Sequence, residues 1–96
     1  MLTWASHFPL SPHDNVQAFY CGVVLLELRF FEEAFSMFKQ SEDLFGRSAP
    51  TSYNLGLCLL GLSRPSEALV FVVEACQLDP AFEPAQLVRR KLEPNM

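Results

Sequence analysis

Apolar, small and acidic residues recur along the chain at intervals of 34 positions. Identical residues repeat in one register at four places, namely Gly22 and Gly56, Leu25 and Leu59, Glu33 and Glu67, and Ala34 and Ala68. Leu10, Leu44 and Leu78 follow the same step. A fixed period of roughly 20–50 residues is typical of proteins in which one supersecondary unit is repeated and stacked. We therefore expect repeated units.

Signals for helix ends recur along the chain. Ser11-Pro12-His13-Asp14 offers an N-cap serine, a proline at the first helical position and an acid in the first turn. Proline also predicts helix starts at Ala49-Pro50-Thr51, Arg64-Pro65 and Glu83-Pro84, and helix ends at Asp79-Pro80 and Leu92-Glu93-Pro94. The chain is therefore predicted to be all-α, with antiparallel helix-turn-helix repeats.

The length of 96 residues suits one domain, which the register divides into four parts. Residues 15–48 and 49–82 form two full units, and residues 83–93 form a capping helix. Residues 1–12 are in register with the end of an earlier second helix, in which Trp4 takes the position of Phe38 and Val72. The predicted architecture is thus two full repeats with a half-repeat on each side.

The second unit carries a known signature. Its first helix contains Tyr53, Leu55-Gly56 and Leu59, and its second helix contains Ala68, Val72, Ala75 and the ending Gln77-Leu78-Asp79-Pro80. This pattern resembles the tetratricopeptide repeat, a pair of antiparallel helices with the same period. The first unit departs from the signature at Cys21, Ser41 and Gly46. The resemblance implies an α-solenoid in which Gly22 and Gly56 let the backbone of the paired helix approach closely.

The resemblance also implies a binding surface, because the first helices of successive repeats line a concave groove. The positions that face this groove are Val16, Phe19, Val23, Leu26 and Glu27 in the first unit, Tyr53, Leu57, Leu60 and Gly61 in the second, and Leu87 and Lys91 in the capping helix, with Pro50 and Pro84 at the edge. Some members of the family clamp a peptide carboxylate with Lys, Asn and Arg at such positions. Here those positions are apolar, which suits the nonpolar face of an amphipathic helix.

Two other uses of the apolar stripe stay open. Trp4 and Phe8 of the N-terminal segment either leave the groove free or fold into it and fill it. If the chain is a homo-oligomer, two copies are expected to pack against each other through the groove. An array of fewer than about three repeats is expected to be marginally stable alone, because both ends expose apolar surface. A bound partner would add stability by mass action.

Composition limits the kinds of partner and the cellular compartment that we expect. Half of the residues are hydrophobic and the net charge is −4, which argues against nucleic acid because phosphate binding needs clustered cations. The basic run Arg89-Arg90-Lys91 is interpreted as favourable charge at a helix C-terminus. No apolar run approaches the ~20 residues of a membrane helix, so no membrane insertion is expected. Three widely spaced cysteines and the lack of a signal peptide favour a cytoplasmic protein.

No pattern in the chain favours catalysis. His7, His13 and Cys21 lack a residue that would orient them, and no spacing of Cys or His is typical of a metal site. The four glycines are assigned to packing and turns. We therefore expect a non-enzyme without a cofactor or metal.

The expected function is to hold a polypeptide. The stretches Leu55-Gly56-Leu57-Cys58 and Ser66-Glu67-Ala68-Leu69 are similar to the needle-subunit chaperones of bacterial type III secretion. That resemblance implies a small cytoplasmic chaperone for an amphipathic helix, with a small helical co-chaperone as a further partner. The alternatives are an adaptor or scaffold subunit of a multiprotein complex, a homodimeric structural protein, and a fragment of a longer array.

Overall fold

The computed structural model describes residues 14–93, and their side chains from Ala18 onward. The predicted N-terminal part, residues 1–12, lies outside the described residues. Within them the regular elements are all α-helices, which confirms the all-α prediction. They are α2 (Asp14–Glu27), α3 (Phe31–Phe45), α4 (Ala49–Gly61), α5 (Pro65–Leu78) and α6 (Glu83–Leu92). No helix of the described part is long and apolar enough to cross a membrane.

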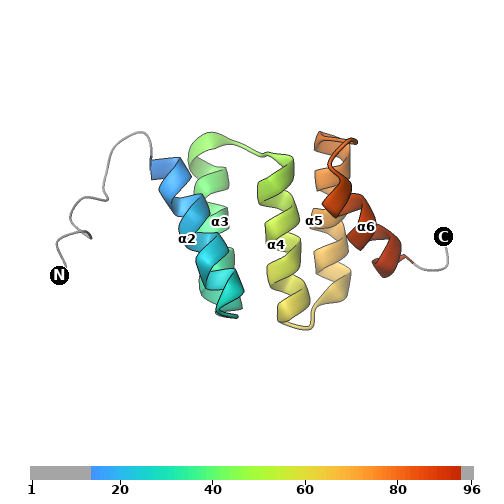
Figure 1. Cartoon of the computed structure of the whole chain (residues 1–96), viewed down its shortest axis with the longest axis horizontal. Coiled ribbons are helices and arrows are strands. Elements are labelled where there is room, and N and C mark those ends of the chain that lie inside the picture. The colour runs from blue at the N-terminus through green and yellow to red at the C-terminus, as the bar shows by residue number, and fades with distance from the viewer. Residues whose placement is uncertain (1–13, 94–96) are drawn as a thin grey trace.

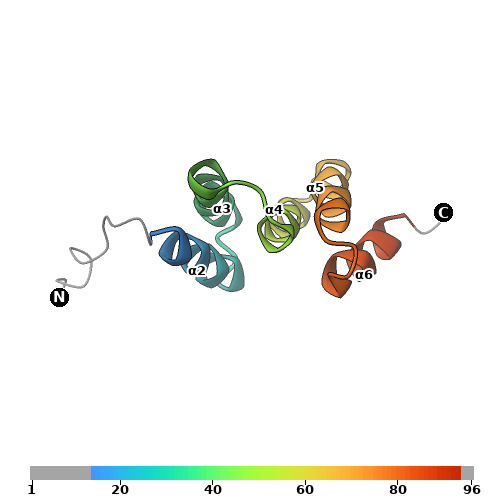
Figure 2. The same cartoon turned by 90° about the horizontal axis from the view of Figure 1, so that it is seen from above.

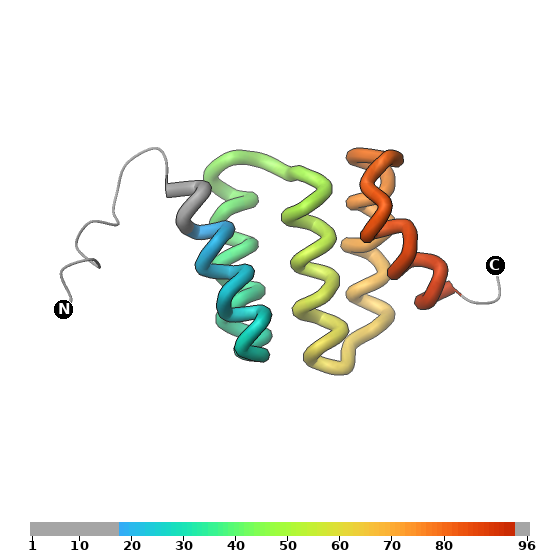
Figure 3. The backbone as a smooth tube through the Cα atoms, viewed as in Figure 1, coloured from blue at the N-terminus to red at the C-terminus, as the bar shows by residue number. Residues whose placement is uncertain are grey.

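The helices lie side by side in chain order (Figure 1), and consecutive helices run in opposite directions (Figure 3). Each one packs mainly against its neighbours in the chain, and α4 also contacts α2 and α6. Seen from above, α3 and α5 lie on one side of the molecule, α2 and α6 on the other, and α4 between them (Figure 2). In terms of the predicted units, α2, α4 and α6 are the first helices, and α3 and α5 are the second helices.

The start of α4 follows from its first residues. The Ser48 hydroxyl accepts a hydrogen bond from the Thr51 amide at 3.4 Å, which satisfies one of the amide groups that lack a partner within the helix. Pro50 lies in the first turn, where a missing N–H costs nothing. Pro65 and Pro84 occupy the same early positions in α5 and α6. Proline thus marks three helix starts in the structure.

The turn between α2 and α3 is closed by two backbone hydrogen bonds. The amide of Phe30 donates to the carbonyl of Leu25 at 2.8 Å, and the amide of Arg29 donates to the carbonyl of Leu26 at 3.0 Å. This nested pair is the Schellman arrangement, which uses the carbonyl groups left free at a helix C-terminus. It requires a left-handed residue, and Arg29 has φ of 68°.

The turn between α4 and α5 has the same bonds 34 residues later. The amide of Arg64 donates to the carbonyl of Leu59 at 2.8 Å, and the amide of Ser63 donates to the carbonyl of Leu60 at 3.0 Å. Ser63 has φ of 62°, close to the value at the equivalent residue of the first turn. The period seen in the sequence therefore recurs in the backbone of the two helix-turn-helix pairs.

The buried residues form two clusters. The central core lies between α3 and α4 and comprises Ala34, Phe38, Leu55 and Cys58. The C-terminal core joins α4, α5 and α6 and comprises Ala49, Val72, Ala75, Cys76 and Ala85. Small residues make up much of both cores, so the helices pack closely and a few larger side chains fill the remaining space.

One glycine in each helical pair sets the distance between its two helices. A Cβ atom at Gly56 would lie 2.8 Å from Cγ2 of Val72 and 3.2 Å from the carbonyl oxygen of Ala68, so the backbone of α5 approaches there as expected. A Cβ atom at Gly22 would instead meet the ring of Phe38 at 2.8 Å. The expected backbone approach at Gly22 is thus replaced by an aromatic ring, because Phe38 is larger than the equivalent Val72.

Replacing Ser63 by glycine should stabilise the protein. Glycine relieves a left-handed strain of ~1–2 kcal/mol and adds ~0.5–1 kcal/mol of backbone entropy to the unfolded chain, so the expected gain is about 0.5–1 kcal/mol. Urea unfolding followed by circular dichroism measures this gain. The control is Ser36→Gly, at an exposed position inside α3, which should lower stability by a few tenths of a kcal/mol or more. A loss of stability in Ser63→Gly would contradict the turn geometry.

Replacing Gly56 by alanine should destabilise the protein despite the better helix propensity of alanine. The propensity gain is ~1 kcal/mol, and forcing a methyl group against fully buried Val72 and the α5 backbone costs ~1–3 kcal/mol. The double variant Gly56→Ala/Val72→Ala should lose less stability than the sum of the two single changes. Additive losses, or a rise in the unfolding free energy of Gly56→Ala, would show that the helices are not in contact here.

Candidate functional site

The predicted groove residues lie on α2, α4 and α6, the first helices of the predicted units. Phe19, Val23 and Leu26 are on α2, Tyr53, Leu57 and Leu60 are on α4, and Leu87 is on α6. These side chains are half-buried, except that of Leu87, which is 53% exposed. The remaining predicted groove residue, Val16, belongs to α2, but its side chain lies outside the described residues.

The groove residues of α2 also support the fold. Phe19, Val23 and Leu26 pack against the central core. The ring of Phe19 meets the ring of Phe38 edge to face, with centroids 5.5 Å apart. Such a contact adds about 0.5–1.5 kcal/mol beyond the area that it buries. A change at Phe19 would therefore disturb the core as well as any binding surface.

The groove residues of α4 fall into two groups. Tyr53 packs against the C-terminal core, and its ring meets that of Phe82 edge to face with centroids 5.5 Å apart. Phe82 precedes α6, so this pair helps to hold the last helix in place. Leu57 and Leu60 are half-buried, and neither is among the described side chains that pack on the two cores. The predicted groove residues that contribute least to the packing of the two cores are therefore Leu57, Leu60 and the exposed Leu87.

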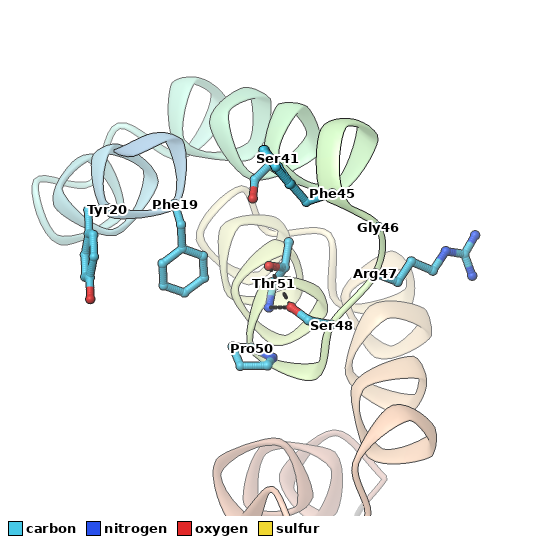
Figure 4. Close-up of a pocket in the computed structure, with 9 residues that line it drawn as sticks. All are labelled: Phe19, Tyr20, Ser41, Phe45, Gly46, Arg47, Ser48, Pro50 and Thr51. Carbon is cyan, nitrogen blue, oxygen red and sulfur yellow. Dashed lines mark hydrogen bonds between the residues drawn. The ribbon is translucent and has the colours of Figure 1, made fainter. Parts of the chain in front are cut away.

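A pocket of about 290 Å³ lies between α2 and the start of α4 (Figure 4). Its lining includes Phe19 and Pro50, both predicted at the groove, and the ring of Phe19 projects into the space between the two helices. The Ser48 hydroxyl donates to that of Thr51 at 3.0 Å on the opposite wall. The pocket thus combines an aromatic side with a polar side.

Sequence reasoning missed two aromatic residues of this pocket. Tyr20 and Phe45 contribute to its lining and are 61% and 47% exposed. Tyr20 directly follows a groove position on α2, and Phe45 ends α3 directly before Gly46. A large aromatic side chain at each of these places is the signal that would have pointed to them.

A second pocket, of about 680 Å³, lies between α3 and α5 on the face of the second helices. Its floor is apolar and is formed by Leu69, Val70, Phe71 and Val73. Two ion pairs flank it, Lys39 with Glu42 at 2.9 Å and Arg47 with Glu74 at 2.5 Å. The sequence analysis assigned no site here. The signal was present in the five consecutive apolar residues 69–73, because a helix in a single layer cannot bury all of its faces.

The basic residues at the end of α6 lie at the surface. Arg89, Arg90 and Lys91 all fall in the last turn of α6, as the sequence predicted, and Arg89 pairs with Glu93 at 3.1 Å. Cations at this end interact favourably with the free carbonyl groups of the helix. Each exposed pair contributes only ~0–1 kcal/mol, so these charges shape the surface more than they stabilise the fold.

The three thiols are all free and differ in exposure. Cys21 is exposed, and Cys58 and Cys76 are buried. Burial raises the pKa of the Cys58 thiol to about 12, because the thiolate loses its hydration there. Among the described residues no three potential metal ligands of the His, Cys, Asp and Glu types come together. His7 and His13, which with Cys21 were not expected to form a site, lie outside the described residues, so that expectation stays untested.

Comparison of the chain with protein families, with characterised proteins and with solved structures finds no match.

Alkylation should distinguish the exposed Cys21 from the buried Cys58. At pH 8 Cys21 is expected to react with iodoacetamide first, and Cys58 only after unfolding, because the thiolate is the nucleophile and burial keeps the Cys58 thiol protonated. Mass spectrometry of timed digests measures the order. Equal rates at Cys21 and Cys58 in the folded protein would contradict the burial of Cys58.

Proposed function

We propose that this chain is a non-catalytic module of the tetratricopeptide-repeat type that binds an amphipathic helix across α2, α4 and α6. Two structural repetitions support the repeat. The nested turn at Arg29 recurs at Ser63, and the glycine contact of Gly22 recurs at Gly56, each after 34 residues. Both are features of the helical pair as a unit, so they point to duplication of the whole pair.

One observation carries the binding proposal. Phe19, Tyr53 and Leu87 are separated by 34 residues each and lie at the same position of α2, α4 and α6. All three keep apolar surface open, with Leu87 the most exposed. A row of apolar side chains across neighbouring helices is the surface that the nonpolar face of a helix requires.

The strength of binding depends on how much of this surface the partner covers. Covering ~500 Å² of apolar area contributes roughly 12 kcal/mol at ~25 cal/mol per Å². Against this gain, the ordering of the partner and the loss of its free motion cost about 4–15 kcal/mol. Binding of useful strength therefore requires most of the row to be covered, from α2 through α4 to α6.

Within this function, a small cytoplasmic chaperone similar to the needle-subunit chaperones of type III secretion is the first candidate. Its support is the resemblance of residues 55–58 and 66–69 and the acidic, apolar character of the chain. A small helical co-chaperone would be the second partner. An adaptor or scaffold subunit is the alternative, and it is favoured by the pocket between α3 and α5, because this pocket offers a second surface on the opposite face.

Charged substitutions should separate the two faces. Capture from the native cell with mass spectrometry first names the partner, and calorimetry then measures its affinity for Leu57→Asp, Leu87→Asp and the control Val70→Asp, which is 66% exposed in the α3–α5 pocket. We expect the first two changes to weaken binding about tenfold or more, which corresponds to ~1.4 kcal/mol, and Val70→Asp to leave it unchanged.

The opposite pattern would reject the groove. If Val70→Asp abolishes binding and Leu57→Asp and Leu87→Asp do not, the partner uses the face of the second helices. If the three variants bind equally well, neither face is used. Phe19 is left intact in this test because its ring supports Phe38.

A further inference from the structure

The outer face of α2 is apolar and uncovered in the described part of the chain. Tyr20, Val24 and Leu28 follow one another at intervals of four residues and so lie along one side of the helix and the turn that ends it. They are 61%, 54% and 59% exposed. We call these three residues the outer α2 face. Three large apolar side chains in a row form a surface that is normally covered.

The equivalent positions after one period are all less exposed, since Cys58 is buried and Asn54 and Leu62 are half-buried. Val24 corresponds to Cys58 after one period, and the neighbouring Cys21 corresponds to Leu55. Cys58 and Leu55 are both 0% exposed and belong to the central core, where α3 covers them. The register position shared by Val24 and Cys58 is therefore exposed in α2 and buried in α4.

The equivalent positions of α6 are covered as well. Val88 and Leu92 correspond to Tyr20 and Val24 after two periods, and both pack against the C-terminal core, to which α5 contributes. In α4 and in α6, the helix that covers this face is the one that directly precedes it in the chain. For α2, the chain that directly precedes it is residues 1–13.

We propose that the segment 1–13 of this chain covers the outer α2 face, with Trp4 as the main anchor. Trp4 falls at the register position of Phe38 and Val72, which are both fully buried. Phe8 follows four residues later, at the position of the buried Cys76. The two aromatic residues thus have the spacing of one helix face, as a covering helix requires.

The length of the segment fits this role. The sequence predicts that a helix containing Trp4 and Phe8 would end before Pro9, because a proline disfavours helical geometry in the residue before it. This prediction leaves residues 9–13 as the connection to α2, a length similar to that of residues 79–82 between α5 and α6. A connection of this length brings the aromatic residues back alongside the helix that follows.

A segment of the same chain is favoured over a second copy. A short connection holds it near the face at an effective concentration of order mM, far above the usual concentration of a second molecule. The outer α2 face is also distinct from the groove of Leu57 and Leu60, which the sequence left open as another place for Trp4 and Phe8. This inference does not depend on the proposed binding function.

The single tryptophan of the chain, Trp4, reports the outcome directly. We expect its fluorescence in the intact chain to be shifted to the blue and protected from iodide quenching. Val24→Asp, and separately Tyr20→Lys, should shift the emission to the red and raise quenching several-fold, with the helix signal in circular dichroism retained because both positions are exposed. Leu57→Asp in the groove and Val70→Asp on α5 are the matched controls and should leave the emission unchanged.

A second readout uses Cys21, which lies beside the outer α2 face. Trp4→Ala should speed alkylation of Cys21 by about tenfold, the factor that ~1.4 kcal/mol of lost packing produces, and should leave Cys58 protected. Trp4→Phe, which keeps an aromatic anchor, should change the rate much less.

Three results would overturn the proposal. The first is emission typical of a solvent-exposed indole in the intact chain, with Cys21 alkylation unaffected by Trp4→Ala. The second is release of Trp4 by Leu57→Asp and not by Val24→Asp, which would place the segment in the groove. The third is a blue shift that disappears on dilution together with a dimer in sedimentation, which would identify a second copy as the cover.

Discussion

The close contact between α4 and α5 at Gly56 sets the geometry on which the rest of the structure depends. Because a Cβ atom there would lie 2.8 Å from Val72, the two helices pack at a distance that any larger residue would prevent. Gly22 sets the distance between α2 and α3 in the same way through Phe38. Two thin helical pairs result, and neither can bury all of its apolar surface within itself.

The stacking of the pairs follows from this constraint. Phe38 fills the space against α2 and also belongs to the core that α3 shares with α4, so one side chain connects three helices. Val72 has the equivalent place between α4 and α6. The two ends of the stack differ, however. Helix α6 ends in a basic turn that is compatible with water, whereas α2 presents Tyr20, Val24 and Leu28.

Surface and core are therefore closely linked in this protein. Phe19 both packs on Phe38 and lines the pocket between α2 and the start of α4, and Tyr53 both packs on Phe82 and belongs to the proposed binding row. Occupation of the groove would cover side chains that already hold α2 and α6 in place. A bound helix is then expected to stabilise the whole stack, since ligand binding to the folded state alone always does so.

The sequence by itself determined the all-α class, the period of 34 and most helix starts, because these depend on local features such as proline, capping residues and the spacing of small residues. It did not identify the Ser48 cap or the pocket between α3 and α5. Only the tertiary structure decided which apolar residues are core. Cys58 and Val24 share one register position, yet one is fully buried and the other is 54% exposed. The reason is physical: burial depends on whether a neighbouring helix covers a face, and a repeat pattern is the same in either case.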